Sequence, residues 1–343
     1  MTNRLLKKFL LLLVGALIVT LGISWFRVSS ASTTFYYEPT DLGTLVGYES
    51  SYAYGLNDLG QVVGWSYNAN RQGHAFLWQN SNNLTDLGTL PNKETSIAYA
   101  INNAGEVIGS SSSPGEFELA FSWKNSTIRQ LSTLPGGQEG SAANDINNAG
   151  EIVGWAYTAN VAHAVLWNDN NITDFGGLDN NASVGLGINE KGESVGYSNY
   201  ITNNSLLNHA ILWEKKNTIT DLTPQALLSS SARRINKKGT VLIDAYPDYL
   251  LSKGEITELG NIDALDLNDK EKVVGYKFNS NFNPVAVLWE QGTITDLNDL
   301  LPPNSGWRLS TASAINNNGQ IAGYGYHNGQ ERAFLLTPVR VTR

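Results

Sequence analysis

The chain contains no cysteine and few charged residues. Without cysteine, neither a disulfide framework nor a thiolate metal site is possible in these 343 residues. Charged residues make up 16% of the chain, well below the roughly 25% typical of globular domains. The formal net charge is −8, whereas nucleic acids and anionic lipids attract clustered Lys and Arg. We therefore expect no nucleic-acid partner and no binding to anionic lipid surfaces.

Sustained helical periodicity is also missing after residue 31, and only one long apolar run exists. This run covers residues 9–26 and follows three basic residues. It is longer than a usual signal-peptide core and just long enough to span a bilayer. Residues 1–31 are therefore predicted to form a hydrophobic N-terminal helix, either a cleaved signal peptide or a retained membrane anchor. In both cases residues 32–343 are exported, to the extracellular space or the periplasm, and contact with the membrane is expected only through a retained anchor.

A short phrase recurs seven times in the remainder. It consists of an aliphatic residue, an Asn, a Gly three positions later and a short apolar strand; its Asn residues are Asn57, Asn102, Asn147, Asn189, Asn236, Asn268 and Asn316. Only Glu271 replaces the Gly. An Asn side chain caps tight turns, and Gly enters the left-handed backbone region at little cost. Each phrase therefore predicts a β-hairpin between two strands.

Two further strand-like stretches follow each hairpin. The third strand has the pattern seen at residues 163–167, "HAVLW", and the fourth that seen at residues 172–176, "ITDFG". Four short strands in 42–48 residues is the size of a β-propeller blade. The fold is therefore predicted to be all-β, a β-propeller built of four-stranded blades.

The two ends of the repeat array decide how many blades are expected. The seventh unit stops after residues 332–336 without a fourth strand, and a spare fourth-strand sequence stands at residues 39–45. Pairing the two ends would give seven blades closed by the N-terminal strand, with no open sheet edge. Blade 5 departs most from the repeat, with Ile243 in place of Gly and Leu251 in place of Trp. Its completeness, and with it a six-bladed or open alternative, stays open.

The units resemble the HAF repeat, a bacterial extracellular repeat named for His-Ala-Phe. The literal motif occurs at residues 74–76, with close variants in blades 3 and 4, and the ending "SGWRLSTASAINNNGQIAGYGYHNGQERAFLLTPV" is similar to the last repeat of such proteins. The resemblance covers roughly residues 35–338. It implies export and a propeller-like fold, and it brings no assigned reaction and no catalytic residues.

Neither the histidines nor any known sequence motif indicates a metal site or a cofactor. His74, His163 and His209 occupy one repeat position on different blades, so they are expected to lie far apart, while metal ligands must converge. The sequence contains no HExxH, GxSxG, P-loop or Rossmann fingerprint. We therefore assign no catalytic residue, no metal site and no cofactor.

Aromatic residues recur where the longer, variable loops begin, on the face where repeat scaffolds usually carry function. They provide two alternatives, a surface for stacking sugars or a cap on the packing between blades. The candidate residues are Trp65, Tyr67, Trp155, Tyr157, Tyr276, Tyr324 and, in another loop on the same face, Trp307.

Charges appear where other units have small residues. The residue two positions before the turn Asn is Gly or Ala in four units. In the other three units it is Asp145, Arg234 or Asp266, and Arg233 stands next to Arg234. First strands surround the axis of a propeller, so these charges are expected to meet there. They could form an internal ion-pair network, hold an anionic or carbohydrate ligand, or supply the paired carboxylates of a hydrolase.

The function predicted from the sequence is binding without catalysis. We expect an exported propeller that binds a polysaccharide or a protein at the cell envelope. A propeller-type glycosidase or lyase and a purely structural surface protein are the two alternatives.

Overall fold

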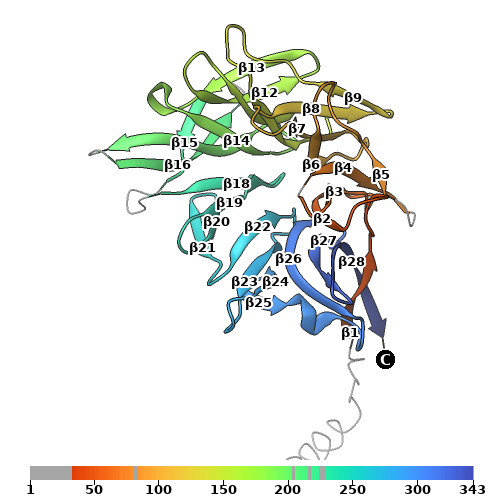
Figure 1. The fold of residues 1–343 in the computed structure, drawn as a ribbon. Helices are drawn as coiled ribbons and strands as arrows, with labels where there is room; N and C mark the ends of the chain where they lie inside the picture. Colours follow the sequence, from red (N-terminus) through yellow and green to blue (C-terminus); the bar gives the residue numbers. More distant parts are fainter. Residues whose placement is uncertain are drawn as a thin grey trace, which may run out of the picture. The chain divides into compact units, whose positions relative to one another are not determined.

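The computed structural model describes residues 33–70, 72–80, 84–202, 205–214, 218–223 and 229–342. The predicted N-terminal helix lies outside these residues. Within them, no helix is long and apolar enough to cross a membrane. Tyr36–Val339 form one compact unit, and its strands are arranged in seven separate four-stranded antiparallel sheets, which confirms the predicted seven-bladed β-propeller (Figure 1).

Each sheet is one blade, and its strands follow one another in chain order. The first three blades contain β2 (Ser50–Leu56), β3 (Val62–Tyr67), β4 (Gly73–Trp78) and β5 (Thr85–Asp86); β6 (Thr95–Ile101), β7 (Val107–Ser112), β8 (Leu119–Lys124) and β9 (Thr127–Gln130); and β10 (Ser141–Ile146), β11 (Ile152–Tyr157), β12 (Ala162–Asn168) and β13 (Asn171–Gly176).

The next three blades repeat this order. They contain β14 (Ser183–Ile188), β15 (Ser194–Thr202), β16 (Ser205–Glu214) and β17 (Thr218–Asp221); β18 (Ser231–Ile235), β19 (Val241–Asp244), β20 (Tyr249–Ser252) and β21 (Glu255–Glu258); and β22 (Asp263–Leu267), β23 (Val273–Phe278), β24 (Pro284–Glu290) and β25 (Thr293–Asp296). Blade 5, β18–β21, is complete despite its degenerate sequence, and its Ile243 and Tyr249 are buried in a hydrophobic cluster.

The seventh blade combines the two ends of the sequence. It contains β26 (Trp307–Ile315), β27 (Ile321–His327) and β28 (Gln330–Thr342), and β1 (Thr33–Asp41) lies beside β28 as the fourth strand. Just after β1, the backbone N–H of Leu42 donates to the carbonyl of Ala333 at 3.1 Å. The Asp41 carboxylate also lies 2.7 Å from Nδ1 of His327. β1 and Leu42 thus lie beside β28.

The recurring Asn and Gly form the turn that the sequence predicts. In blade 1, Oδ1 of Asn57 accepts hydrogen bonds from the backbone N–H groups of Leu59 and Gln61. The Gly of the turn has a positive φ in all six units that carry it, for example +76° at Gly105. Glu271 adopts the same conformation, with φ of +61°. A residue with a β-carbon enters this region at a cost of roughly 1–2 kcal/mol, so the geometry of the turn is imposed on Glu271 by its surroundings.

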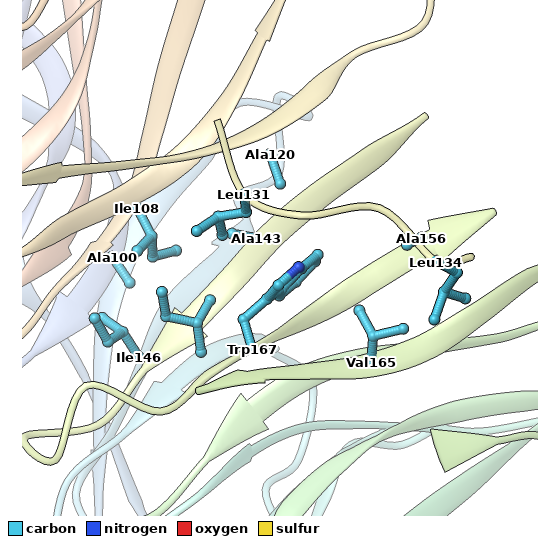
Figure 2. Packing of buried hydrophobic residues seen from close by; sticks show 11 residues of the cluster. Ala100, Ile108, Ala120, Leu131, Leu134, Ala143, Ile146, Ala156, Val165 and Trp167 are labelled. Atoms are coloured by element: carbon cyan, nitrogen blue, oxygen red, sulfur yellow. The ribbon is translucent and has the colours of Figure 1, made fainter. Parts of the chain in front are cut away.

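The apolar residues form the core between adjacent blades. In the cluster between blades 2 and 3, Trp167 is 1% exposed and packs with Ile108, Leu131 and Ile146 (Figure 2). Its indole N–H donates to the carbonyl of Ser132 at 2.7 Å, so the ring is buried without an unpaired donor. The repeated Trp of the third strand is therefore a packing residue in blades 1, 3, 4 and 6, where it is buried.

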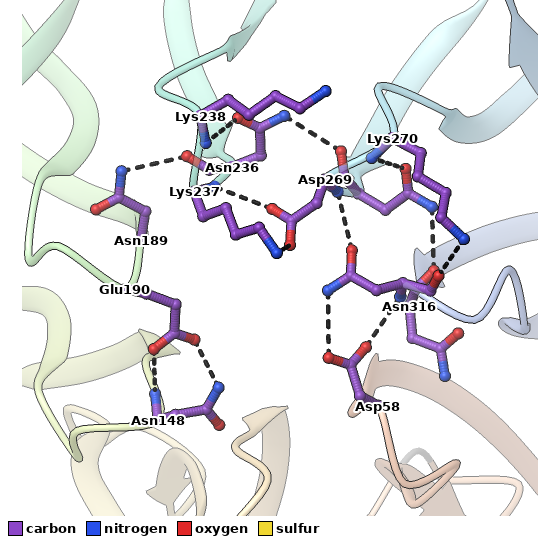
Figure 3. A network of polar contacts seen from close by, with 12 residues as sticks. Asp58, Asn148, Asn189, Glu190, Asn236, Lys237, Lys238, Asp269, Lys270 and Asn316 are labelled. Carbon is purple, nitrogen blue, oxygen red and sulfur yellow. Dashed lines mark hydrogen bonds and ion pairs between the residues drawn. The ribbon is translucent and has the colours of Figure 1, made fainter.

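A closed ring of side-chain hydrogen bonds joins the seven Asn turns. In every blade Nδ2 of the turn Asn donates to the backbone carbonyl of the turn Asn in the next blade, at distances of 2.9–3.3 Å. Asn316 of blade 7 donates in the same way to Asn57 of blade 1. Part of this ring is drawn in Figure 3. The Asn residues thus both cap their own turns and connect the blades, and only the first of these roles is apparent from sequence.

A second ring runs through the residue after each turn Asn. Its backbone N–H donates to the side-chain oxygen of the corresponding residue in the next blade, as Asn103 does to Asn148 at 2.8 Å and Asp269 to Asn317 at 3.0 Å. The pattern is interrupted between Glu190 and Lys237, because the Lys237 ammonium group has no acceptor. Lys237 itself continues it, since its N–H donates to Oδ1 of Asp269 at 3.0 Å, and its ammonium group lies 3.1 Å from the same carboxylate (Figure 3).

Candidate functional site: an axial pocket lined by one residue of every blade

Every first strand carries a β-bulge at one repeat position. The pairing of first and second strands shifts by one residue three positions before the turn Asn; the bulged residues are Tyr54, Tyr99, Asn144, Leu186, Arg233, Leu265 and Ser313. A bulge turns the extra residue away from the regular alternation of a strand. One side chain per blade is thereby directed differently from its neighbours.

All seven bulged residues line one cavity of about 310 Å³. Its remaining lining residues are Arg234, Thr311 and Tyr324. Thr311 and Tyr324 pair across β26 and β27, before the bulge at Ser313. The cavity therefore lies at the centre of the propeller, on the side where the first strands begin, which is the side of the long loops.

The lining is chemically divided. Blades 1, 2 and 7 contribute three tyrosines, and the ring of Tyr54 lies against that of Tyr99 with centroids 6.3 Å apart. Tyr324 stacks on Tyr52 at 4.1 Å. Blade 5 contributes Arg233 and Arg234, the only charged residues of the lining, among the residues that the structure describes. The cavity thus has aromatic rings, two guanidinium groups and the short polar side chains of blades 3 and 7.

The charge of Arg234 is balanced by carboxylates that do not line this cavity. Its Nε lies 3.3 Å from Oδ1 of Asp266, and its Nη1 donates to the carbonyl of Leu186 at 2.9 Å. Asp145 is close enough for its charge to interact with Arg234. Burial raises the pKa of both Asp145 and Asp266, and Arg234 opposes that rise. The predicted meeting of charges at the axis is therefore present for Asp145, Arg234 and Asp266, as an internal ion-pair network.

The carboxylates of Asp145 and Asp266 also form hydrogen bonds between adjacent blades. Oδ2 of Asp145 accepts from the N–H of Ile188 at 2.9 Å, and Oδ2 of Asp266 accepts from the N–H of Ile315 at 2.8 Å. They line a second, smaller cavity of about 200 Å³ with the turn Asn residues of six blades. That cavity combines recurring turn residues with Asp145, Arg234 and Asp266, whose carboxylates already accept backbone N–H groups.

Arg233 makes a different set of contacts from its neighbour. Its Nη2 lies 2.6 Å from Oδ2 of Asp244, on β19 of the same blade. Its Nε is buried and has no hydrogen-bond partner within the described part of the chain. Arg233 therefore reaches the cavity with one nitrogen paired and another unsatisfied.

The aromatic candidates other than Tyr324 do not line the cavity. Trp65 stacks on Tyr67 at 4.3 Å, and Trp155 meets Tyr157 edge to face. Trp307 stacks on His327 at 4.6 Å. Tyr276 lies near the cavity wall, since the charges of Arg233 and Asp244 influence its hydroxyl, whose pKa is raised mainly by burial. These rings pack against other side chains, mostly of their own blades, although Tyr157 also contacts Phe117 of blade 2.

Tyr67 belongs to a buried cluster at the junction of blades 1 and 7. Its hydroxyl donates to Oε2 of Glu331 at 2.8 Å, and Tyr52 and Tyr326 approach Oε1 of the same carboxylate at 3.4 and 3.0 Å. Burial and these hydrogen bonds raise the pKa of Tyr67. Glu331 thus joins β2 and β3 to β27 and β28.

The histidines form a repeated pair with aspartate. His74, His163 and His209 on third strands lie 2.7–3.0 Å from an Asp on the fourth strand of the same blade. Among the described residues, no three His, Asp or Glu side chains converge on a point where a metal ion could bind.

Sequence reasoning found Arg233, Arg234 and Tyr324 but missed most of the cavity. The lining residues that were not predicted are Tyr54, Tyr99, Asn144, Leu186, Leu265, Thr311 and Ser313. A signal was available, because the position three before the turn Asn holds Tyr, Asn, Leu, Arg or Ser while the position before it is Ala or Gly in every unit. Variation at one position of an otherwise regular repeat indicates a role outside the scaffold.

Comparisons with known proteins identify the fold. No family model matches the chain, and no curated protein matches it. Among solved structures, the β-propeller domain of the Trilobed protease from Pyrococcus furiosus matches with a TM-score of 0.54 and 9% identity, over 86% of this chain and 99% of that one. A structure described as YCF48 bound to D1 peptide matches with a TM-score of 0.48 and 11% identity, over 90% and 95% of the two chains. At 9% identity, the similarity to the Trilobed protease domain supports the β-propeller fold alone.

Proposed function

We propose that this protein is an exported, non-catalytic propeller that binds a saccharide of an envelope polysaccharide in its axial pocket. The observation that carries the proposal is the bulge ring: one variable side chain of every blade lines a single cavity of about 310 Å³. Ligand pockets are typically preformed, a few hundred Å³ in size, and lined by aromatic groups with a small number of polar ones. Tyr54, Tyr99 and Tyr324 supply faces for sugar rings, and Asn144, Thr311 and Ser313 supply hydrogen-bonding groups.

The contacts of the acidic residues favour binding over hydrolysis. A glycosidase needs one carboxyl to give a proton and another to act as base or nucleophile, both facing the substrate. Asp145 and Asp266 instead accept backbone N–H groups of the next blade and interact with Arg234. Neither lines the larger cavity. A glycosidase or lyase built on this pair therefore has little support from the geometry.

Export and closure by the N-terminal strand belong to the same proposal. Export rests on the apolar run at residues 9–26 and on the resemblance to HAF repeats. Closure is supported by the position of β1 beside β28 and by the hydrogen bond from Leu42 to Ala333. A closed ring would keep the seven bulged residues at fixed distances, which lowers the entropy cost of binding.

A glycan array probed with the purified full-length protein tests the proposal. We expect retention of a defined group of glycans without release of any product. Tyr54→Ala should weaken that binding at least about tenfold, the change expected when roughly 1.4 kcal/mol of contact energy is lost. Leu265→Trp should block the cavity by filling it.

The matched control is the double variant Trp65→Ala and Trp155→Ala. These rings lie outside the cavity, so the variant should bind within about twofold of the unaltered protein. Loss of binding in this folded variant, with Tyr54→Ala unaffected, would place the ligand on the outer aromatic residues. Release of reducing ends from a bound glycan would show an enzyme.

A further inference from the structure

We infer that the saccharide bound in the axial pocket carries an acidic group, a carboxylate or a sulfate, and that Arg233 binds it. This inference rests on the proposed function and specifies its ligand. It starts from the unequal situation of two adjacent arginines, Arg233 and Arg234, in the wall of one cavity.

Arg234 is a structural arginine. Asp266 lies 3.3 Å from its Nε, and its Nη1 donates to the backbone carbonyls of Leu186 and Arg233 at 2.9 and 3.0 Å. Asp145 adds a second carboxylate close by. These contacts fix Arg234 between the two cavities and account for its charge without any ligand.

Arg233 has one carboxylate contact among the described residues. Its Nη2 lies 2.6 Å from Asp244, a carboxylate that is 38% exposed. Its Nε is buried and has no hydrogen-bond partner in the described part of the chain, so protein groups satisfy the guanidinium only in part. The Arg233 side chain as a whole is 37% exposed, and a ligand could therefore reach it.

The position of Arg233 brings its side chain to the cavity. Arg233 is the bulged residue of β18, equivalent to Tyr54 and Tyr99 in blades 1 and 2. Because the bulged residue of every blade lines the cavity, the Arg233 side chain forms part of its wall. No carboxylate is part of that wall within the described residues. An anionic group entering the cavity would therefore meet guanidinium donors without a competing acid on the lining.

The shape of the guanidinium suits an oxyanion. A planar guanidinium donates two parallel hydrogen bonds to a carboxylate or sulfate, and such charge-assisted bonds are about twice as strong as neutral ones. A neutral sugar hydroxyl can occupy only part of this geometry. The three tyrosines of blades 1, 2 and 7 would contact the sugar ring, and Arg233 its acidic substituent.

The test uses matched acidic and neutral glycans with the full-length protein. Glycans bearing uronate, sialate or sulfate are arrayed beside their carboxyl-reduced or desulfated counterparts. We expect the acidic member of a pair to bind at least about tenfold more tightly, a difference of roughly 1.4 kcal/mol. Arg233→Gln should remove that preference while leaving the weak binding of the neutral member. Whether uronates or sulfated sugars are retained distinguishes the two sources of charge.

The control variant is Arg129→Gln, an arginine on β9 that is 46% exposed and does not line the cavity. It should keep the acidic preference, and thermal unfolding of both variants verifies that they are folded. Equal binding of acidic and neutral glycans by the unaltered protein would overturn the inference and leave the proposed function standing. An unchanged acidic preference in folded Arg233→Gln would also overturn it. Absence of binding to every glycan would overturn the proposed function itself.

Discussion

The side-chain amide of Asn316 donates a hydrogen bond of 2.9 Å to the backbone carbonyl of Asn57, across 259 residues of sequence. This bond is the seventh in a ring in which each blade donates to the next. Both atoms are buried, so neither can exchange its partner for water. The same Asn that shapes a turn thus also sets the distance between blades, and with it the size of the axial pocket.

Replacing a turn Asn by Asp should separate its two roles. Asn102→Asp keeps the oxygen that caps the turn but loses the amide that donates to Asn147 at 3.2 Å. A buried carbonyl would then face a carboxylate, and we expect a loss of about 1–3 kcal/mol in the free energy of unfolding. Denaturant unfolding measures it. Asn103→Asp, one residue later, should change stability little, because the side-chain oxygen that accepts from Asp58 is retained. Equal effects of the two changes would contradict the role of the ring.

The repeated Trp is expected to be a major source of stability. Trp167 is 1% exposed, and Trp167→Ala should lower the free energy of unfolding by about 3–5 kcal/mol, the usual range for a buried aromatic residue. Trp155→Ala, at a partly exposed ring of the same blade, should lower it by clearly less. A melting temperature unchanged in Trp167→Ala would contradict the packing between blades 2 and 3.

The pair of His74 and Asp86 should make stability depend on pH. The hydrogen bond that His74 donates to Asp86 raises the pKa of His74 above 6.5, despite opposing burial. Burial raises the pKa of Asp86, but His74 and the N–H of Gly88 outweigh it and leave the pKa below 3.8. The raised His pKa contributes stability that is present below 6.5 and lost as pH rises through the folded-state value. The lowered Asp pKa contributes stability that is present above 3.8 and lost as pH falls.

Unfolding measured from pH 4 to pH 9 therefore tests Asp86→Asn. Its deficit relative to the unaltered protein should be largest between about pH 4 and 6.5 and should shrink above that window. Asp179→Asn, at an exposed acid, serves as the control and should follow the unaltered protein. A deficit of the same size at every pH would show that the ion pair makes no contribution.

The N-terminal strand should be required for a soluble fold. Leu42 and Leu45 are 1% and 5% exposed, and both pack in the cluster between blades 1 and 7. Deleting residues 32–45 would leave the backbone of β28 unpaired and expose that cluster, so we expect aggregation, measured as loss of soluble protein. Asp41→Asn keeps the backbone pairing and should have a far smaller effect, although it weakens the contact with His327. Full solubility of the deletion variant would contradict the proposed closure.

The sequence by itself determined the class of fold and favoured seven blades, while the completeness of blade 5 was decided by the structure. Turn chemistry is local, so an Asn followed three residues later by a Gly, as at Asn57 and Gly60, predicts a hairpin. Alternating apolar residues predict strands in the same way. Repetition of these local signals then defines the unit and its count. Even blade 5 follows the pattern, because its turn Asn236 and Gly239 are retained although Ile243 and Leu251 replace the usual Gly and Trp.

The tertiary structure decided what the repeated positions do together. A hydrogen bond from Asn102 to Asn147 or from Asn316 to Asn57 joins residues that no local pattern relates. The bulge at Arg233 is likewise invisible in composition, because a one-residue shift in strand pairing depends on how two strands meet. The same shift in all seven blades directs the side chains of the bulged residues toward the propeller axis. The scaffold could be predicted because its forces act within one hairpin, whereas the pocket exists only after seven hairpins are arranged around a common centre.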